Sequence, residues 1–433
     1  MSEETLRQGL QSDPPPPTST EDDHSRGTIA YVSVICGLAW IASVYDFTLF
    51  GTVLPVIADE FGWTPADATM INTISQVGIF LVSLVPGLLI DRLGRRKTLI
   101  FLMVGGAVVS GITGIAVGAV SLILIRSLSG LSLAEEVVNA VYLSEMLKKV
   151  KNKGFVYSLV QGGWPIGALV GAAVCSVTLP LIGWRWSFCV AAAATLLIIP
   201  FALRLPESKQ FQKVTASVET YPSVPNSPRQ EGAKRPGFSS ELRQLFSPTL
   251  RRHTTALCSA WLFNWFGNQV LTVLGTTILV EAKGIPLERS LIILIVSNVT
   301  AFIGYLVHGW LGDRVGRRNT IIRSWLVASA VSVGLLLGPN NELFVFVAYS
   351  VFLFFQLGPY AALLFYMGES FPVQVRGSGA NLAHALAPVG SIFGSGLLGL
   401  MLYAHMPMSV AAVIAGSLFI GISAVCLLFA DKD

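Results

Sequence analysis

Long apolar runs separated by short polar loops dominate this chain of 433 residues. A helix needs roughly 20 apolar residues to cross the hydrocarbon core of a bilayer. Runs at least that long include Thr98–Ile125, Phe155–Ile182 and Pro407–Ala430. Only 12% of the residues are charged, whereas soluble domains carry about 25%, so the surface is not built for water. The runs predict an all-α integral membrane protein that crosses the lipid bilayer many times.

One long polar segment divides the apolar runs into two sets of six. This segment, 206–251, is rich in Pro, Ser and charge, a composition typical of a linker. Residues 1–27 contain Pro14–Pro17 and several acids, so we expect a disordered cytoplasmic tail there. We predict two pseudo-symmetric six-helix bundles, over 28–205 and 252–430. Their twelve transmembrane helices are expected at 29–56, 66–90, 98–117, 120–147, 154–178, 184–204, 252–280, 287–311, 320–338, 342–368, 378–403 and 407–430.

The orientation is predicted from Lys and Arg, which are enriched in the cytoplasmic loops of membrane proteins. Alternate loops are rich in these residues, whereas the loops between them hold little beyond Arg185, Lys283 and Arg289. We therefore expect both termini on the cytoplasmic side of the cell membrane, the inner or plasma membrane. The basic residues assigned to the inside are Arg92, Arg95, Arg96, Lys97, Lys148, Lys149, Lys151, Lys153, Arg314, Arg317, Arg318 and Arg376.

A motif that occurs in both sets of spans indicates a duplication. The first copy, Gly87–Lys97, reads G-L-L-I-D-R-L-G-R-R-K, and the second, Gly309–Asn319, reads G-W-L-G-D-R-V-G-R-R-N. The copies are offset by 222 residues (309 − 87). A second pair of acids, Glu145 and Glu369, has an offset of 224 (369 − 145). Two motifs in the same order at nearly one offset predict two halves related by an axis along the membrane normal.

The repeated G-x-x-x-D-R-x-G-R-R signature resembles that of the major facilitator superfamily, from about residue 28 to the end of the chain. The resemblance implies twelve helices and alternating access by rocking of two halves. Glycines allow tight turns, and the acid can pair with a base or cap a helix, so the motif is expected to latch the halves together. Alternatively, its arginines only fix the orientation. The predicted gating residues are Asp91, Arg92, Gly94, Arg95, Arg96, Asp313, Arg314, Gly316, Arg317, Glu145, Glu369 and Arg376.

Two residues of opposite charge, Asp46 and Arg126, lie within predicted spans at similar depths in the outer half of the bilayer. Ionisable groups inside a membrane cost roughly 2.5–3.5 kcal/mol on insertion scales, and they are functional candidates for that reason. One hypothesis is that Asp46 takes up a proton and frees Arg126 to bind a substrate carboxylate. The alternative is a permanent structural ion pair.

Two adjacent acids, Glu135 and Glu136, follow Arg126 on the same predicted span, near the midplane. At 100° per residue, Glu135 is turned about 180° from Arg126 and Glu136 about 80°. If Arg126 faces the cavity, Glu136 is the better placed proton carrier, and Glu135 would pack against a neighbouring span. His384 is a weaker candidate for proton relay, and His308 is expected to be structural.

Uncharged polar residues in the predicted spans are candidates for substrate binding. The amides Asn264 and Asn268 are spaced i, i+4, and Gln356 and Tyr360 repeat this spacing. Residues with this spacing share one face of a helix. They either contact substrate or hydrogen-bond neighbouring helices. With Arg126, the predicted substrate-binding residues are Tyr45, Gln161, Asn264, Asn268, Gln356 and Tyr360.

Several segments resemble one group of branches within the superfamily, the proton-driven symporters of organic acids of the sialate, lactate and aromatic-acid type. Tyr45–Phe50 is similar to their first span, and Ala134–Glu136 resembles an Ala-Gly-Glu pattern in their fourth. The resemblance implies proton-coupled symport of a small organic acid or related metabolite. Ser132 and Glu135 depart from the pattern, because they stand where glycines are expected.

Two other functions stay open. The chain could be a proton-driven exporter of cationic or amphipathic compounds, because the intramembrane acids outnumber Arg126, or a transporter-like sensor that moves no solute. An enzyme is not expected, since the sequence shows no nucleophile–base spacing, metal cluster or nucleotide loop. No cofactor or metal is expected. The small formal charge of +4 does not indicate nucleic-acid binding. The expected partners are lipid, protons and a small solute, bound by a functional monomer.

Overall fold

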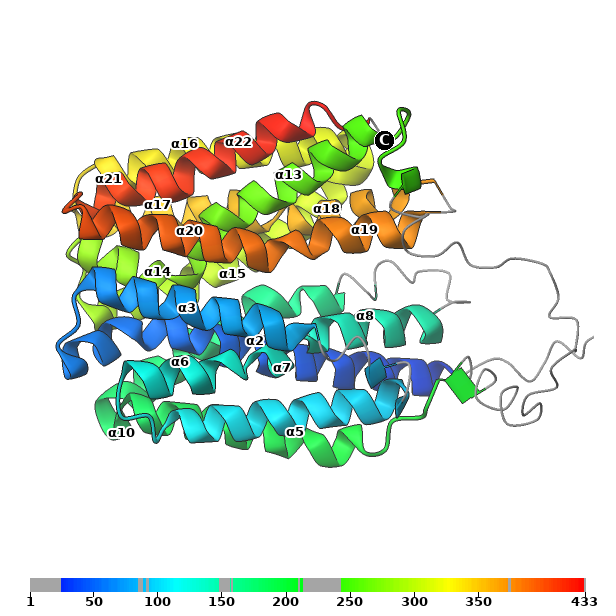
Figure 1. The fold of residues 1–433 in the computed structure, drawn as a ribbon, viewed down its shortest axis with the longest axis horizontal. Helices are drawn as coiled ribbons and strands as arrows, with labels where there is room; N and C mark the ends of the chain where they lie inside the picture. The colour runs from blue at the N-terminus through cyan, green and yellow to red at the C-terminus, as the bar shows by residue number, and fades with distance from the viewer. Residues whose placement is uncertain are drawn as a thin grey trace, which may run out of the picture.

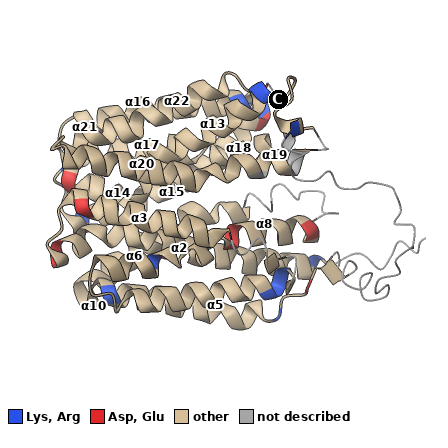
Figure 2. Cartoon of the chain, in the orientation of Figure 1, with Lys and Arg blue, Asp and Glu red and all other residues tan. Residues whose placement is uncertain are grey.

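The computed structural model of the protein describes residues 25–84, 89–90, 93–147, 156, 159–208, 211–212, 243–372 and 375–431. These residues form helices and connecting loops and include no β-strand. Figure 1 shows the helices side by side along the long axis of the molecule. Charged residues lie mainly at the two ends, and the middle holds few of them (Figure 2). The all-α prediction is confirmed for the part of the chain that the structure describes.

The N-terminal part, 25–212 as far as it is described, begins with a helix of 36 residues. Ser25 caps this helix by accepting a hydrogen bond from the Thr28 N–H at 3.1 Å, and Gly62 ends it with a φ of 66°, a conformation that favours glycine. Thr64 and Asp67 then form a capping box for the next helix. The elements are α2 (Arg26–Phe61), α3 (Pro65–Ser83), α5 (Arg95–Thr113), α6 (Ala119–Ser127), α7 (Gly130–Leu133), α8 (Glu135–Met146) and α10 (Gly163–Ala202).

The C-terminal part, 243–431 as far as it is described, contains three stretches of π-helix. The stretch Gln269–Val273 lies against α2, where a Cβ on Gly51 would come within 2.2 Å of the Val273 carbonyl oxygen. Glycine is therefore needed at position 51 for this close approach. The elements are α13 (Arg251–Asn268), η1 (Gln269–Val273), α14 (Gly275–Thr277), η2 (Ile278–Ala282), α15 (Leu287–Val315), α16 (Arg317–Leu337), α17 (Glu342–Leu357), α18 (Tyr360–Glu369), α19 (Arg376–His384), α20 (Leu386–Tyr403), α21 (Met408–Ala412), η3 (Val413–Ser417) and α22 (Leu418–Leu427).

Eight helices among the described residues are long and apolar enough to cross a membrane. One of them, Leu159–Ala202, has 44 residues and would measure about 66 Å if straight, about twice the thickness of a hydrocarbon core. Gly183 interrupts it with a φ of 75° and a ψ of 174°, between the predicted spans 154–178 and 184–204. The eight are Arg26–Phe61, Arg95–Thr113, Leu159–Ala202, Leu287–Val315, Arg317–Leu337, Glu342–Leu363, Ser378–Tyr403 and Met408–Leu427.

The predicted spans 120–147, 342–368 and 378–403 are each divided into separate α-helices in the structure. The first is divided into α6, α7 and α8, the second into α17 and α18, and the third into α19 and α20. Pro359 follows the end of α17, and its missing N–H removes one hydrogen bond of the helix. The residues at the second and third breaks keep right-handed helical dihedral angles, so the direction of the chain is preserved across them.

Large apolar side chains cover much of the outer surface of the helices. Leu181, Leu197 and Leu343 are 74%, 73% and 70% exposed, respectively. Contiguous apolar surface of this kind is rare on soluble proteins and marks contact with a partner or a membrane. The surface fits a lipid environment around the bundle.

Candidate functional site

A cavity of about 270 Å³ lies between the N-terminal and C-terminal parts of the chain. We call it the main cavity. Its walls are mostly apolar, with single polar residues at Gln76, Ser83, Glu136, His384 and Ser391. This combination of apolar walls and a few polar groups is typical of small-molecule sites. The other lining residues are Phe47, Phe80, Leu84, Leu133, Ala134, Val137, Trp164, Trp265, Ala385, Ala387 and Pro388.

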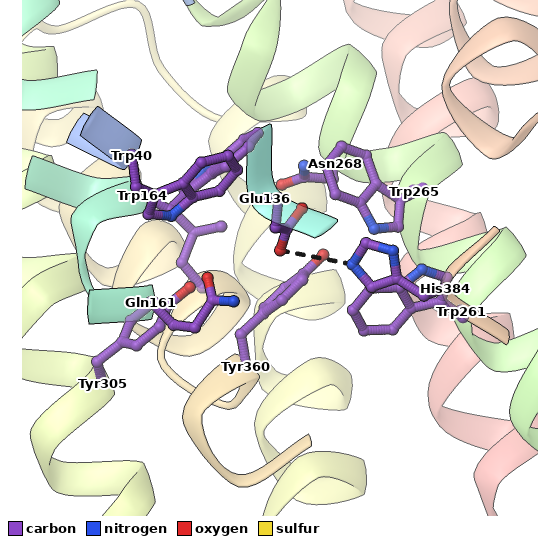
Figure 3. Close-up of a pocket in the computed structure, with 11 residues that line it drawn as sticks. Trp40, Glu136, Gln161, Trp164, Trp261, Trp265, Asn268, Tyr305, Tyr360 and His384 are labelled. Atoms are coloured by element: carbon purple, nitrogen blue, oxygen red, sulfur yellow. Dashed lines mark ion pairs between the residues drawn. The ribbon is translucent and has the colours of Figure 1, made fainter. Parts of the chain in front are cut away.

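A second, smaller pocket of about 30 Å³ adjoins the main cavity (Figure 3). We call it the aromatic pocket, because six of its eleven lining residues are tryptophans or tyrosines. Trp164 and Trp265 come from different parts of the chain and meet edge to face, with ring centroids 5.7 Å apart. Both lie in the walls of both pockets. The lining residues are Trp40, Glu136, Gln161, Trp164, Trp261, Trp265, Asn268, Tyr305, Leu357, Tyr360 and His384.

Glu136 and His384 form an ion pair across the two parts of the chain (Figure 3), with Nε2 and Oε1 separated by 3.5 Å. Glu136 stands in the first turn of α8 and His384 is the last residue of α19. Each residue therefore lies at one of the helix interruptions. The Trp261 ring packs 5.3 Å from the imidazole. The pair lines both pockets, so a bound solute would touch it.

Glu135 points away from both pockets, toward α2. The Ser43 hydroxyl donates to its carboxylate at 2.5 Å, and the Asn139 side-chain amide donates at 3.5 Å. Glu135 is 1% exposed. The two adjacent acids therefore have different surroundings, since Glu135 is enclosed by protein and Glu136 faces the cavity.

Asp46 and Arg126 also lie together, but outside the two pockets. The Arg126 guanidinium is 3.4 Å from one carboxylate oxygen and donates to the Asp46 main-chain carbonyl at 3.3 Å. The rings of Phe50 and Phe188 flank it, with centroids 5.3 and 5.4 Å away. The Asp46 side chain is 5% exposed and the Arg126 side chain is 1% exposed. The structure brings this predicted pair together and encloses it in apolar surroundings.

The predicted substrate-binding amides divide into two groups. Asn264 accepts hydrogen bonds from the Gln356 amide at 3.2 Å and from the Tyr360 hydroxyl at 2.6 Å. Its own amide donates to Ser423 at 3.4 Å. These contacts join α13 to α17, α18 and α22. In this structure the Asn264 group therefore hydrogen-bonds neighbouring helices, which is one of the two alternatives considered for it. Asn268 is separate from this group, and it lines the aromatic pocket.

Two further predicted binding residues, Tyr45 and Gln161, lie in different places. Gln161 lines the aromatic pocket. Tyr45 is 2% exposed and lines neither pocket. His308 is buried, and its Nδ1 lies 2.8 Å from the Gly304 carbonyl oxygen on the same helix.

The first gating motif forms a network within the N-terminal part. Arg95 binds both carboxylate oxygens of Glu145, with its shortest contact at 2.7 Å. The Ser208 hydroxyl donates to the same carboxylate at 2.5 Å. Glu207 accepts from the Arg95 N–H at 2.9 Å and so caps the start of α5, where the helix dipole favours an acid. Arg96 donates to the Leu203 carbonyl. Asp91 and Arg92 lie outside the described residues, and Gly94 has a φ of 89° before α5.

The second gating motif holds the end of the chain. Arg318, next to the predicted residues, donates to the carbonyls of Leu427 and Leu428 at 2.9 and 2.8 Å. Arg317 pairs with Asp313 one turn earlier at 3.1 Å. The remaining predicted gating residues are Arg314, which stacks on Trp310 at 4.2 Å, Gly316, with a φ of 92°, Glu369, which ends α18, and Arg376, which begins α19.

Among the described residues, three hydrogen bonds join the two parts in the half of the molecule away from the gating motifs, which the sequence predicts to face outward. We call them the outer contacts. They run from the Tyr403 hydroxyl to Asp67 at 2.7 Å, from Thr73 to Ser395 at 2.9 Å, and from Thr276 to the Gly51 carbonyl at 2.9 Å. In the described part of the chain, this end is therefore held closed by contacts between helices far apart in the sequence.

The tryptophans around the pocket were not among the residues that the sequence analysis selected. Trp261 and Trp265 have the same i, i+4 spacing on α13 as Asn264 and Asn268, and this spacing was the available signal. Within the described residues, no group of three or more His, Cys, Asp and Glu side chains is placed to hold a metal ion. The side chains that line the two pockets offer one acid–imidazole pair, amides, hydroxyls and aromatic rings.

Comparison with known proteins identifies relatives along most of the chain. The family model described as Major Facilitator Superfamily matches residues 36–358. A Bacillus subtilis (strain 168) protein named as a candidate niacin/nicotinamide transporter is 23% identical over 403 residues, which cover 92% of this chain and 95% of that protein. The benzoate transport protein of Acinetobacter baylyi is 25% identical over 398 residues, covering 87% of this chain and 84% of that protein.

A solved structure with the same fold is the bacterial homologue of the human lysosomal transporter Spinster, in an inward-facing and unoccupied conformation. It matches with a TM-score of 0.69 at 14% identity, covering 94% of this chain and 96% of that chain. At this identity the match concerns the fold alone.

Proposed function

The chain belongs to the Major Facilitator Superfamily, and from this premise we propose that it is a proton-coupled symporter of a small organic acid. The family and the names of the relatives indicate a membrane transporter rather than an enzyme. We propose that the solute occupies the main cavity, that the proton is carried beside it, and that the two parts of the chain rock to expose the cavity to either side in turn.

The twelve-span arrangement is part of this proposal. We propose that 28–205 and 252–430 each form six spans joined by the linker 206–251, after a cytoplasmic tail at 1–27. The interruption at Gly183 supports counting α10 as two spans. The position of Arg95, Arg96 and Arg318 supports placing the gating motifs on the cytoplasmic side, because basic residues are retained there. The chain would act as a monomer in the cell membrane.

The Glu136–His384 pair is the observation that carries the proton-coupling proposal. It joins the two parts of the chain and lines the main cavity. When a proton binds Glu136, its charge is lost and His384 becomes free to pair with a substrate carboxylate. Proton and anion then enter together, because an unpaired charge is costly inside a membrane. Release of both restores the pair.

Asp46 and Arg126 take a supporting role in this proposal. Their contacts are enclosed between Phe50 and Phe188 in the present conformation. We propose that Arg126 is held by Asp46 while the outer contacts are closed, and that protonation of Asp46 frees it in another step of the cycle. Glu135, hydrogen-bonded to Ser43, is the alternative proton carrier.

The chemistry of the cavity and the names of the relatives support the substrate class. Aromatic walls with one imidazole fit a small acid that carries an apolar ring. Relatives are named for niacin and for benzoate, which are ring acids. We propose that this chain takes a small ring acid of the same general kind.

Uptake of benzoate into proteoliposomes tests the proposal. A gradient of one pH unit, acid outside, is worth about 1.4 kcal/mol and supports about tenfold accumulation by a one-proton symporter. We expect the Glu136→Gln protein to lose this accumulation. The same variant should still exchange benzoate across the membrane when no pH gradient is present. Glu135→Gln, next to it in the sequence, is the matched control and should accumulate normally.

Wild-type accumulation in Glu136→Gln would contradict the role of Glu136. Loss of accumulation in Glu135→Gln alone would assign the proton to Glu135 instead. If a pH gradient that is acid outside drives solute out of the vesicles, the alternative function of a proton-driven exporter would be favoured.

A further inference from the structure

The size of the aromatic pocket limits what it can hold. A cavity needs roughly 10–15 Å³ to take one water molecule, so a volume of about 30 Å³ admits only one or two atoms besides hydrogen. An aromatic ring does not fit there. The main cavity, about nine times larger at about 270 Å³, must therefore hold the body of the solute, and only a substituent can reach the aromatic pocket.

The walls of the aromatic pocket carry polar atoms without hydrogen-bond partners among the described residues. The fully buried atoms of this kind include the side-chain oxygen of Asn268 and the indole N–H groups of Trp40, Trp261 and Trp265. Asn268 is 1% exposed, and Figure 3 shows its amide on the same side of the pocket as Glu136. Leaving a buried polar group unpaired is unfavourable, so these atoms favour a polar occupant.

Comparison with Asn264 shows why Asn268 is the amide available to a ligand in this pocket. Asn264, one turn earlier on α13, already bonds Gln356 and Tyr360 and does not line the pocket. Tyr360 lines the pocket, but its hydroxyl is bound to Asn264.

We propose that the aromatic pocket is a subsite for one hydroxyl group carried on the ring of the solute, and that Asn268 is the residue that recognises it. A hydroxyl both donates and accepts, so it can bond the amide in either of its two orientations and also accept from an indole N–H. The carboxylate would lie beside His384 in the main cavity. This inference rests on the proposed function, since it assumes an acid substrate.

Binding to the purified full-length protein tests the subsite. Benzoate and its three monohydroxylated isomers are compared by isothermal titration calorimetry in detergent at one pH. A hydrogen bond to an otherwise unpaired buried group corresponds to roughly fivefold to a hundredfold in affinity. We expect at least one hydroxylated isomer to bind in that range more tightly than benzoate. In Asn268→Leu, which keeps the branched shape at Cγ but carries no polar group, the ratio should fall to about one.

Asn298→Leu is the matched control. Asn298 is an equally buried amide on α15 with an unpartnered oxygen, and it lines neither pocket. We expect it to keep the wild-type ratio.

Equal binding of all four acids by the wild-type protein would overturn the subsite, even if Asn268→Leu did not fold. A folded Asn268→Leu protein that kept the preference would also overturn it. In either of these two cases, binding and transport of benzoate would leave the proposed function standing although the subsite fails. If none of the four acids binds, the acid substrate fails and the subsite fails with it.

Discussion

Asp46 and Arg126 show what a buried pair contributes at the scale of single residues. Both side chains are almost fully enclosed, at 5% and 1% exposed. Removing one member of such a pair leaves an unpaired charge and costs about 3–5 kcal/mol, whereas replacing both is often close to neutral. We predict that Asp46→Asn strongly destabilises the protein and that Asp46→Asn with Arg126→Gln restores most of the loss. Thermal unfolding of the purified protein in detergent measures both effects.

The double variant also separates the two interpretations of the pair. If the pair is structural, the restored protein should transport benzoate at near the wild-type rate. If Arg126 binds the anion, uptake stays low although stability returns. A single Asp46→Asn variant as stable as the wild type would show that Arg126 has another partner.

The adjacent amides and acids show how far sequence reasoning reaches at this scale. Helical geometry separates Glu135 from Glu136 and places one of them toward Arg126, and the structure gives these two acids different surroundings. The same geometry puts Asn264 and Asn268 on one face and does not distinguish them. Which of two such amides is already bonded depends on the neighbouring helix, and Gln356 and Tyr360 reach only Asn264. The spacing of residues within one helix does not determine how that helix is rotated relative to its neighbours.

At the scale of elements, Gly183 has a distinct role within α10. Its φ of 75° and ψ of 174° belong to a region that is essentially restricted to glycine. A Cβ at this position would meet nothing within 4 Å, so any cost of substitution comes from the backbone alone. We predict that Gly183→Ala lowers stability by about 1–3 kcal/mol, measured by thermal unfolding.

Gly37→Ala is the control for this change. Gly37 has helical geometry in α2, and a Cβ there would sit 4.0 Å from Val160, in ordinary contact. It should be neutral or slightly stabilising, because alanine is the better helix former. An equal loss in both variants would contradict the strain argument.

The helices were predictable from their apolar runs, but not all of their interruptions were. The break before Pro359 had a local signal in Gly358-Pro359, since proline removes a helix hydrogen bond. The break at Ala385 had none, because nothing in its side chain disfavours a helix. Both breaks bring cavity residues, Tyr360 and His384, to the ends of short helices. The positions of these breaks depend on contacts between helices, and the periodicity of residues along one helix does not reveal such contacts.

At the scale of the whole molecule, the outer contacts join the two parts, and the proposed rocking motion would have to break them to open the cavity on that side. Tyr403 donates to Asp67 across the two parts. A hydrogen bond to a charged group such as this carboxylate contributes about 1.5–3 kcal/mol, so its loss should raise the outward-open population roughly tenfold to a hundredfold. We predict this increase in Tyr403→Phe. The measurement is the labelling rate of Ser391→Cys by a membrane-impermeant maleimide added outside, with the five native cysteines replaced.

Tyr31→Phe removes the same chemical group from a bond that does not join the two parts. Tyr31 donates to the Phe201 carbonyl at 2.8 Å, and both residues belong to the N-terminal part. Its labelling rate should match that of the parent protein. Equal acceleration in both variants would point to general loosening rather than to opening of the outer end.

The weakness of the outer contacts has a consequence for turnover. Two neutral hydrogen bonds of about 0.5–1.5 kcal/mol each and one to the Asp67 carboxylate of about 1.5–3 kcal/mol bias the closed state by only a few kcal/mol. This is the size of gap at which two conformations exchange readily. A charged clamp buried at the same place would hold the closed form far longer and would slow each cycle. In the proposed cycle, contacts made by threonine, serine and tyrosine hydroxyls would therefore part easily, and opening at this end would not slow the passage of solute.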